Sequence, residues 1–354
     1  MRSKKVKLII NIITITALIV LLVVSWPQIT EGLRQIGGAK WSVIFLMLPL
    51  QIINFTAIGK IYQSYFKSTG HENISTWFGL KLALELNFVN HVFPSGGVAG
   101  FSYLSIRLKD KGIRVARSTL AQVIRWALNF TSFLLILFVG MFLLSFGSGS
   151  SGGGVALFIG LSITFLTLFT TLVAVYIVSS ENRIRAFTAF LPKVFNGIYK
   201  RLTKKEMINI GRIEVLFSDF HKNYMEIAKD WRQLKISFVW ALIVNLTEVA
   251  TIYLAYIALG QPVNPGAVIL AYAVASFAGL VAILPGGIGV YEALMAGVLA
   301  SAGVPKALAL SATLIYRIFT IVVFVPAGFV LYQIALRQTD GELKSGTRAH
   351  INSD

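Results

Sequence analysis

Long runs of apolar side chains, separated by short polar stretches, dominate this chain. A helix needs about 20 residues to cross a bilayer core of roughly 30 Å. Six runs have about that length, and we expect spanning helices at 8–25, 41–59, 118–146, 155–178, 236–259 and 307–334. The first run follows a basic start, as in a signal peptide. No small-residue cleavage site precedes Trp26, so we expect a retained anchor.

Two further apolar stretches, 76–106 and 266–302, are interrupted in the middle. The interruptions read FPSGGVAGFSY at 93–103 and LPGGIGVYEAL at 284–294. Proline removes a backbone donor and glycine loosens a helix, so such turns occur at membrane depth only where protein buries them or water reaches them. We expect two re-entrant hairpins, with turns formed by Pro94, Gly96, Gly97, Pro285, Gly286 and Gly287.

The distribution of basic residues sets the expected topology. Basic clusters follow the first hairpin at 107–117 and occupy 183–205, whereas the loops at 147–154 and 261–266 carry no charge. Under the positive-inside rule, the first hairpin enters from the cytoplasm and the second from outside. We therefore expect a multi-pass protein of the cell (plasma) membrane with cytoplasmic N- and C-termini.

The predicted fold is all-α, with six spanning helices and two re-entrant hairpins in an inverted-topology repeat. The halves are 1–146 and 155–336, and 337–354 forms a cytoplasmic tail. AQVIRWALNFTSFLLILFVG from Ala121 and ATLIYRIFTIVVFVPAG from Ala312 each carry one arginine near the start of a span. Within the second half, 181–233 alternates apolar and basic residues at helical spacing, which predicts amphipathic helices at the cytoplasmic interface, either as a connector or with a regulatory role.

Composition agrees with a polytopic membrane protein. Of 354 residues, 56% are hydrophobic and 13% are charged, and the mean hydropathy of +0.74 is far above that of a soluble domain. The net charge of +17 is explained by basic loops, so we expect no nucleic-acid partner. The chain has no cysteine, which excludes disulfides, thiol catalysis and thiolate metal sites.

Two arginines lie within predicted spans, where an unpaired charge costs at least roughly 2–3 kcal/mol. Arg125 lies near a basic flank and could reach the interface by snorkelling, whereas Arg317 lies deeper and favours a functional role. A guanidinium fork suits phosphate better than an ammonium group does. The glycine turns offer backbone donors at half-helix N-termini, which favours an anion site, although such glycines also permit close helix packing.

Acidic and other polar residues complete the predicted site. Glu248 lies in mid-span and Glu292 follows the second glycine turn, and either could pair with an arginine, bind a cationic group or carry a proton. Lys81 and Glu85 have the spacing of a helical ion pair. We expect His91 to be a hydrogen-bonded residue at a helix end, and polar lining from Asn87, Asn90 and Tyr103.

The sequence lacks the catalytic and cofactor motifs that it partly imitates, so we expect neither an enzyme nor a bound cofactor or metal. PSGG has glycine where the PSGH motif of membrane lipid phosphatases has histidine. GGIGVYEA lacks the third glycine and the βαβ context of a dinucleotide site, and neither a Walker motif nor HExxH occurs.

PSGGVAG, PGGIGVYEA and the two arginine-bearing spans resemble the lysylphosphatidylglycerol synthase transmembrane, or flippase-like, family over 8–336. That resemblance implies movement of charged or glycosylated lipids across the bilayer. Because the tail 337–354 is short, we expect no aminoacyl-transferase domain and no lipid synthesis. We therefore expect a flippase that binds the phosphate headgroup of an anionic or lipid-linked substrate through Arg317, Arg125, Glu292, Glu248, Tyr103 and the glycine turns. The alternatives are a secondary transporter of a small anionic solute and a scaffold that recruits lipid-modifying enzymes through 181–233.

Overall fold

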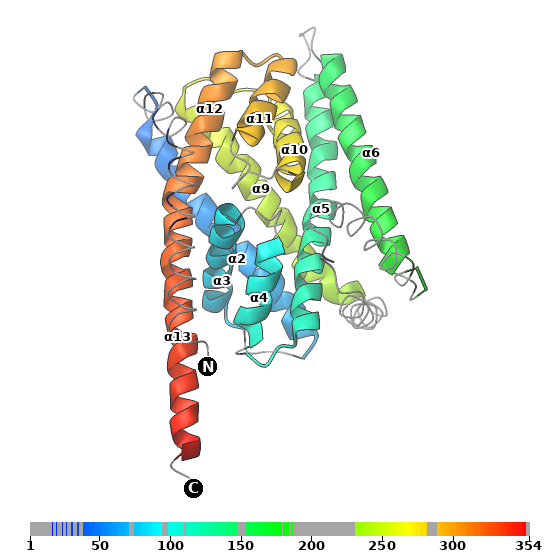
Figure 1. The fold of residues 1–354 in the computed structure, drawn as a ribbon. Coiled ribbons are helices and arrows are strands. Elements are labelled where there is room, and N and C mark those ends of the chain that lie inside the picture. The colour runs from blue at the N-terminus through cyan, green and yellow to red at the C-terminus, as the bar shows by residue number, and fades with distance from the viewer. Residues whose placement is uncertain are drawn as a thin grey trace, which may run out of the picture.

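The computed structural model describes residues 16, 19, 23, 26, 30, 34, 38–70, 74–93, 98–109, 111–146, 153–178, 180, 182–183, 186, 231–281 and 289–351. Within these residues the protein is all-helical (Figure 1). Four stretches are long and apolar enough to cross a membrane: Trp41–Ser68, Val115–Leu144, Lys235–Ala258 and Lys306–Gln338. The chain is thus a multi-pass membrane protein, as its hydropathy predicts.

The long helices begin close to the expected positions. They are α2 (Trp41–Ser68), α5 (Val115–Phe146), α6 (Gly153–Val178) and α9 (Lys235–Ala258). Helix α2 continues past the predicted end at 59, because Tyr62, Tyr65 and Phe66 are buried in the core. A short 3₁₀ helix, η1 (Trp231–Leu234), precedes α9.

Each interrupted apolar stretch contains two short helices. The first pair is α3 (Thr76–Val92) and α4 (Val98–Lys109), and the second is α10 (Pro265–Val281) and α11 (Val290–Ser301). Figure 1 shows the first pair in the lower half of the bundle and the second pair in the upper half. The Pro-Gly turns between them lie outside the described residues, as does most of the predicted insertion 181–233.

The last helical run is interrupted just after Arg317. Helix α12 (Lys306–Phe319) leads through a π-helical turn, η3 (Thr320–Phe324), into α13 (Val325–Ile351). Proline lacks an N–H group, so Pro326 weakens the regular hydrogen-bond ladder at this point. Helix α13 continues through most of the predicted tail 337–354, as far as Ile351.

Glycines set how closely the helices approach. A Cβ on Gly59 of α2 would lie 2.4 Å from the carbonyl carbon of Gly79 in α3. Two helix crossings join distant parts of the chain: α5 contacts α10, and α13 contacts α3. At these crossings a Cβ on Gly266 would lie 2.2 Å from the carbonyl oxygen of Gly140, and one on Gly328 would lie 2.3 Å from that of Leu84.

Candidate functional site: a buried ion pair at a helix start

The candidate site is built on the first turn of α11. Gly289 precedes this helix with φ of +86°, a left-handed conformation that glycine adopts without strain. The backbone N–H of Gly289 donates to Oε2 of Glu292 at 2.6 Å. Glu292 thereby satisfies one of the free donors at the helix start, and its charge is favourable at this end of the helix dipole.

Arg317 brings α12 to the same carboxylate. Its Nε donates to Oε1 of Glu292 at 2.6 Å, and its guanidinium carbon lies 4.8 Å from the ring centre of Tyr291. Arg317 is 7% exposed and Glu292 is 4% exposed, so the ion pair is buried. Removal of one partner from such a pair typically costs about 3–5 kcal/mol, because the other charge is left uncompensated.

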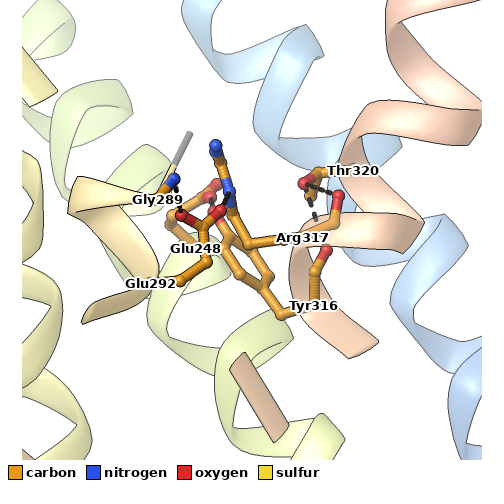
Figure 2. A network of polar contacts seen from close by, with 6 residues as sticks. All are labelled: Glu248, Gly289, Glu292, Tyr316, Arg317 and Thr320. Atoms are coloured by element: carbon orange, nitrogen blue, oxygen red, sulfur yellow. Dashed lines mark hydrogen bonds and ion pairs between the residues drawn. The ribbon is translucent and has the colours of Figure 1, made fainter. Parts of the chain in front are cut away.

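A second carboxylate, Glu248 of α9, lies beside this pair. Its Oε2 accepts from Nδ2 of Asn54 at 3.0 Å and from Nε2 of Gln51 at 3.2 Å, and its Oε1 accepts from the hydroxyl of Tyr316. All three donors are neutral groups, contributed by α2 and α12. Figure 2 shows Glu248, Glu292 and Arg317 converging from α9, α11 and α12.

The first pair of helices also approaches this site. His91 lies near the end of α3, and the charge of Arg317 acts on it. As expected for a helix-end residue, Nδ1 of His91 hydrogen-bonds the carbonyl oxygen of Asn87 at 2.9 Å.

Arg125 belongs to a different cluster, between α5 and α2. Its Nε donates to Oε1 of Gln122 at 3.3 Å, and its guanidinium carbon lies 5.9 Å from the ring centre of Tyr62. The hydroxyl of Tyr62 also bonds Gln122. Arg125 is half-buried, and no contact in the described part of the chain joins it directly to Arg317.

Tyr103 lies in a third cluster, within the first helix pair. Its hydroxyl donates to Oε2 of the buried Glu85 at 2.8 Å, and Nε of Arg107 donates to the same oxygen at 3.1 Å. The expected Lys81–Glu85 contact is therefore replaced by an ion pair with Arg107, and the ammonium group of Lys81 lies over Trp77. Helices α3 and α4 are in contact, and this brings Arg107 beside Glu85.

Of the predicted site residues, the structure brings Arg317, Glu292 and Glu248 together. The predicted turn residues lie outside the described residues: Pro94, Gly96, Gly97, Pro285, Gly286 and Gly287.

Sequence reasoning missed four residues of this site, Gln51, Asn54, Tyr291 and Tyr316. Gln51 and Asn54 are polar residues inside an apolar span, which is a readable signal of a site. The two tyrosines are indistinguishable in sequence from ordinary membrane aromatics. The described residues contain no group of three or more histidines and carboxylates that could hold a metal ion.

These features define a polytopic helical membrane protein with a charged site buried among its helices. The chain belongs to the family described as the lysylphosphatidylglycerol synthase TM region, whose profile matches residues 8–328. It is 20% identical over 324 residues to a UPF0104 membrane protein of Pyrococcus horikoshii, an alignment that covers 87% of this chain and 92% of the relative. It is 30% identical over 142 residues to a UPF0104 membrane protein of Methanothermobacter thermautotrophicus, covering 39% of each chain. No solved structure matches the chain.

Proposed function

We propose that this protein is a lipid flippase that moves a phosphate-bearing headgroup, of an aminoacylated or glycosylated lipid, across the membrane without catalysing a reaction. The observation that best supports this function is the buried Glu292–Arg317 ion pair beside Glu248. Charged residues inside a membrane bundle are expensive and typically mark a substrate or ion pathway. The matched family, described as the transmembrane region of a lipid-modifying synthase, supports a lipid substrate.

The proposed path is a polar zone between two inverted halves. In this arrangement the helix pairs α3–α4 and α10–α11 are re-entrant hairpins, and six helices span the bilayer. Two observations support it: the pairs lie in opposite halves of the bundle, and each packs against the third helix of the other half. The two segments that align in sequence both end in a crossing glycine, Gly140 or Gly328.

In the proposed cycle, the headgroup phosphate competes with Glu292 for the guanidinium of Arg317. The acyl chains stay in the lipid while the headgroup crosses, so only the polar part needs protein donors. Arg125, the glycine turns and Tyr103 remain predicted headgroup contacts. Cytoplasmic termini and a plasma-membrane location complete the proposal.

The test is transbilayer movement of acyl-labelled phosphatidylglycerol in proteoliposomes of the purified protein. We expect rapid movement of this lipid, little movement of an acyl-labelled glycosphingolipid that lacks phosphate, and a loss of at least about tenfold in rate for Arg317→Ala, equivalent to about 1.4 kcal/mol. Equal rates for the two lipids, or an unchanged rate in the variant, would contradict the proposal. Uptake of a phosphate-bearing solute without lipid movement would favour the solute-transporter alternative.

A further inference from the structure

The charges of the buried site do not balance. Glu248 and Glu292 contribute two carboxylates, and Arg317 contributes one guanidinium. The other titratable groups facing Glu248 are tyrosines: Tyr272 of α10, Tyr291 of α11 and Tyr316 of α12. Helix α2 presents the neutral amides of Gln51 and Asn54, and α5 presents Asn129 and Ser132 to Asn245 of α9. On α3, His91 hydrogen-bonds the carbonyl oxygen of Asn87 through Nδ1 and is counted as neutral. Among the described residues the site therefore has a net charge of −1.

Two of the donors to Glu248 have fixed orientations. The amide nitrogen of Asn54 also donates to the carbonyl oxygen of Val244 at 2.9 Å, which only a donor can satisfy. The amide nitrogen of Gln51 also donates to Oγ1 of Thr251 at 3.1 Å. The Thr251 hydroxyl donates its own hydrogen to the carbonyl oxygen of Thr247 at 2.7 Å, so its Oγ1 can only accept from Gln51. Both amides must therefore present N–H groups, and Oε2 of Glu248 remains an acceptor.

The third donor is adaptable. A phenolic hydroxyl both donates and accepts, so Tyr316 can accept from a protonated Oε1 of Glu248. Its released hydrogen then has an acceptor close by. The rings of Tyr316 and Tyr291 stack with centroids 6.4 Å apart, and the buried hydroxyl of Tyr291 faces that of Tyr316. Glu248 can thus take up a proton by reversal of one hydroxyl, without rearranging either amide.

Glu292 lacks such a partner. Its two oxygens accept from the backbone N–H of Gly289 and from Nε of Arg317, and neither group can accept a hydrogen in return. Among the described contacts of the two carboxylates, only Glu248 has a partner that can both donate and accept a hydrogen bond.

We propose that Glu248 is the proton-binding group of the transporter and that one proton crosses with each phosphate headgroup. This inference rests on the proposed function. A singly charged phosphate on Arg317 would bring the site from −1 to −2, and a proton on Oε1 of Glu248 restores −1. The proton enters from water on one side and leaves to water on the other. A singly anionic headgroup, such as that of phosphatidylglycerol, and its proton together carry no net charge, so coupling lowers the electrostatic cost of crossing.

The first experiment measures protonation directly. Infrared difference spectra of the purified full-length protein, recorded between neutral and mildly acidic pH, should contain the C=O stretching band of a protonated carboxylic acid. We expect this band to lose one component in Glu248→Gln and to shift in Tyr316→Phe, which removes the hydroxyl partner. Glu85→Gln is the matched control, because Glu85 is also buried and hydrogen-bonded by a tyrosine. A spectrum of Glu248→Gln identical to that of the wild type would overturn the assignment whether or not the protein moves lipid.

The second experiment measures coupling in proteoliposomes that contain acyl-labelled phosphatidylglycerol. With one proton per headgroup, a one-unit pH gradient should enrich the labelled lipid by up to about tenfold in the leaflet facing the alkaline side. We expect Glu248→Gln to abolish the enrichment, whereas the folded fraction of Glu85→Gln should enrich the lipid as the wild type does. Rapid movement with equal leaflets in the wild type would overturn the coupling and leave the flippase intact. No movement of the lipid would instead refute the proposed function, and the infrared result would then decide the role of Glu248 alone.

Discussion

Two arginine–glutamate pairs lie inside the described bundle, and their surroundings differ. Arg107 is paired with Glu85 between two adjacent helices of one pair. Arg317 is paired with Glu292 beside a further carboxylate, next to two tyrosines. Burial of an ion pair is weak evidence of stabilisation, since the desolvation cost offsets the attraction. The surplus carboxylate therefore indicates function at Arg317 more than the pair itself does.

Tyr103→Phe should destabilise the protein. Phenylalanine keeps the ring contact with Tyr332 but removes the 2.8 Å hydrogen bond to Glu85. A buried acceptor that loses a donor typically costs about 1–3 kcal/mol. We expect a lower Tm for the detergent-purified variant, measured by intrinsic fluorescence. A Tm equal to that of the wild type would show that Arg107 alone satisfies Glu85.

At the residue scale, sequence reasoning found the charged members of the site and missed their neutral partners. A glutamate or arginine inside an apolar run stands out because of its transfer cost. The contact between Glu248 and Tyr316 joins residues 68 positions apart, and that between Asn54 and Glu248 joins residues 194 apart. Such pairings depend on which helices pack together, which one sequence does not contain.

At the scale of elements, the approach of α10 to α5 depends on small residues and on one cap. Asn264 precedes α10, where its Oδ1 accepts from the N–H of Gly266 at 2.8 Å and its Nδ2 donates to the carbonyl oxygen of Leu143 at 3.1 Å. Pro265 follows at the first helical position, where its missing N–H costs nothing. The sequence NPG at 264–266 thus starts α10, and the side chain of its asparagine joins this helix to α5 through a hydrogen bond.

Gly266→Ala should force these helices apart. The added Cβ would lie 2.2 Å from the carbonyl oxygen of Gly140 and 2.7 Å from the backbone nitrogen of Leu144. Overpacking of this kind typically costs about 1–3 kcal/mol, and backbone atoms yield less than a flexible side chain. We expect a lower Tm and reduced yield of folded protein.

The matched control is Gly297→Ala in α11, where the added Cβ meets nothing within 4 Å. Alanine should be neutral there or stabilise the helix by up to about 1 kcal/mol. Equal Tm values for Gly266→Ala and the wild type would contradict the close approach.

Hydropathy located the described elements well because lipid imposes both length and polarity on a spanning helix. Proline and glycine marked the two interruptions for the same reason. The π-helical turn after Arg317 was not foreseen, although Pro326 gave a signal of irregularity. The position of this π-helical turn depends on packing, since α12 packs on α11 whereas α13 packs on α3.

At the scale of the whole molecule, the proposed topology places the α4–α5 loop inside the cell and the α9–α10 loop outside. The chain has no cysteine, so single cysteines can be introduced without background. Lys111 and Gln261 are both exposed, one in each loop. In intact cells, a membrane-impermeant maleimide should label Gln261→Cys and spare Lys111→Cys until the membrane is permeabilised. Labelling of both cysteines in intact cells, or the reverse pattern, would contradict this topology.

The central claim is that Arg317 binds the phosphate of a crossing headgroup, and charge-conserving variants test it most directly. Arg317→Lys and Arg107→Lys each keep the charge of an ion pair inside the bundle but lose the guanidinium fork. The deciding measurement is the rate at which each variant moves acyl-labelled phosphatidylglycerol across proteoliposomes. We predict a loss of at least about tenfold, or about 1.4 kcal/mol, for Arg317→Lys and a near wild-type rate for Arg107→Lys. Wild-type rates for both variants, or the same loss in both, would contradict the account.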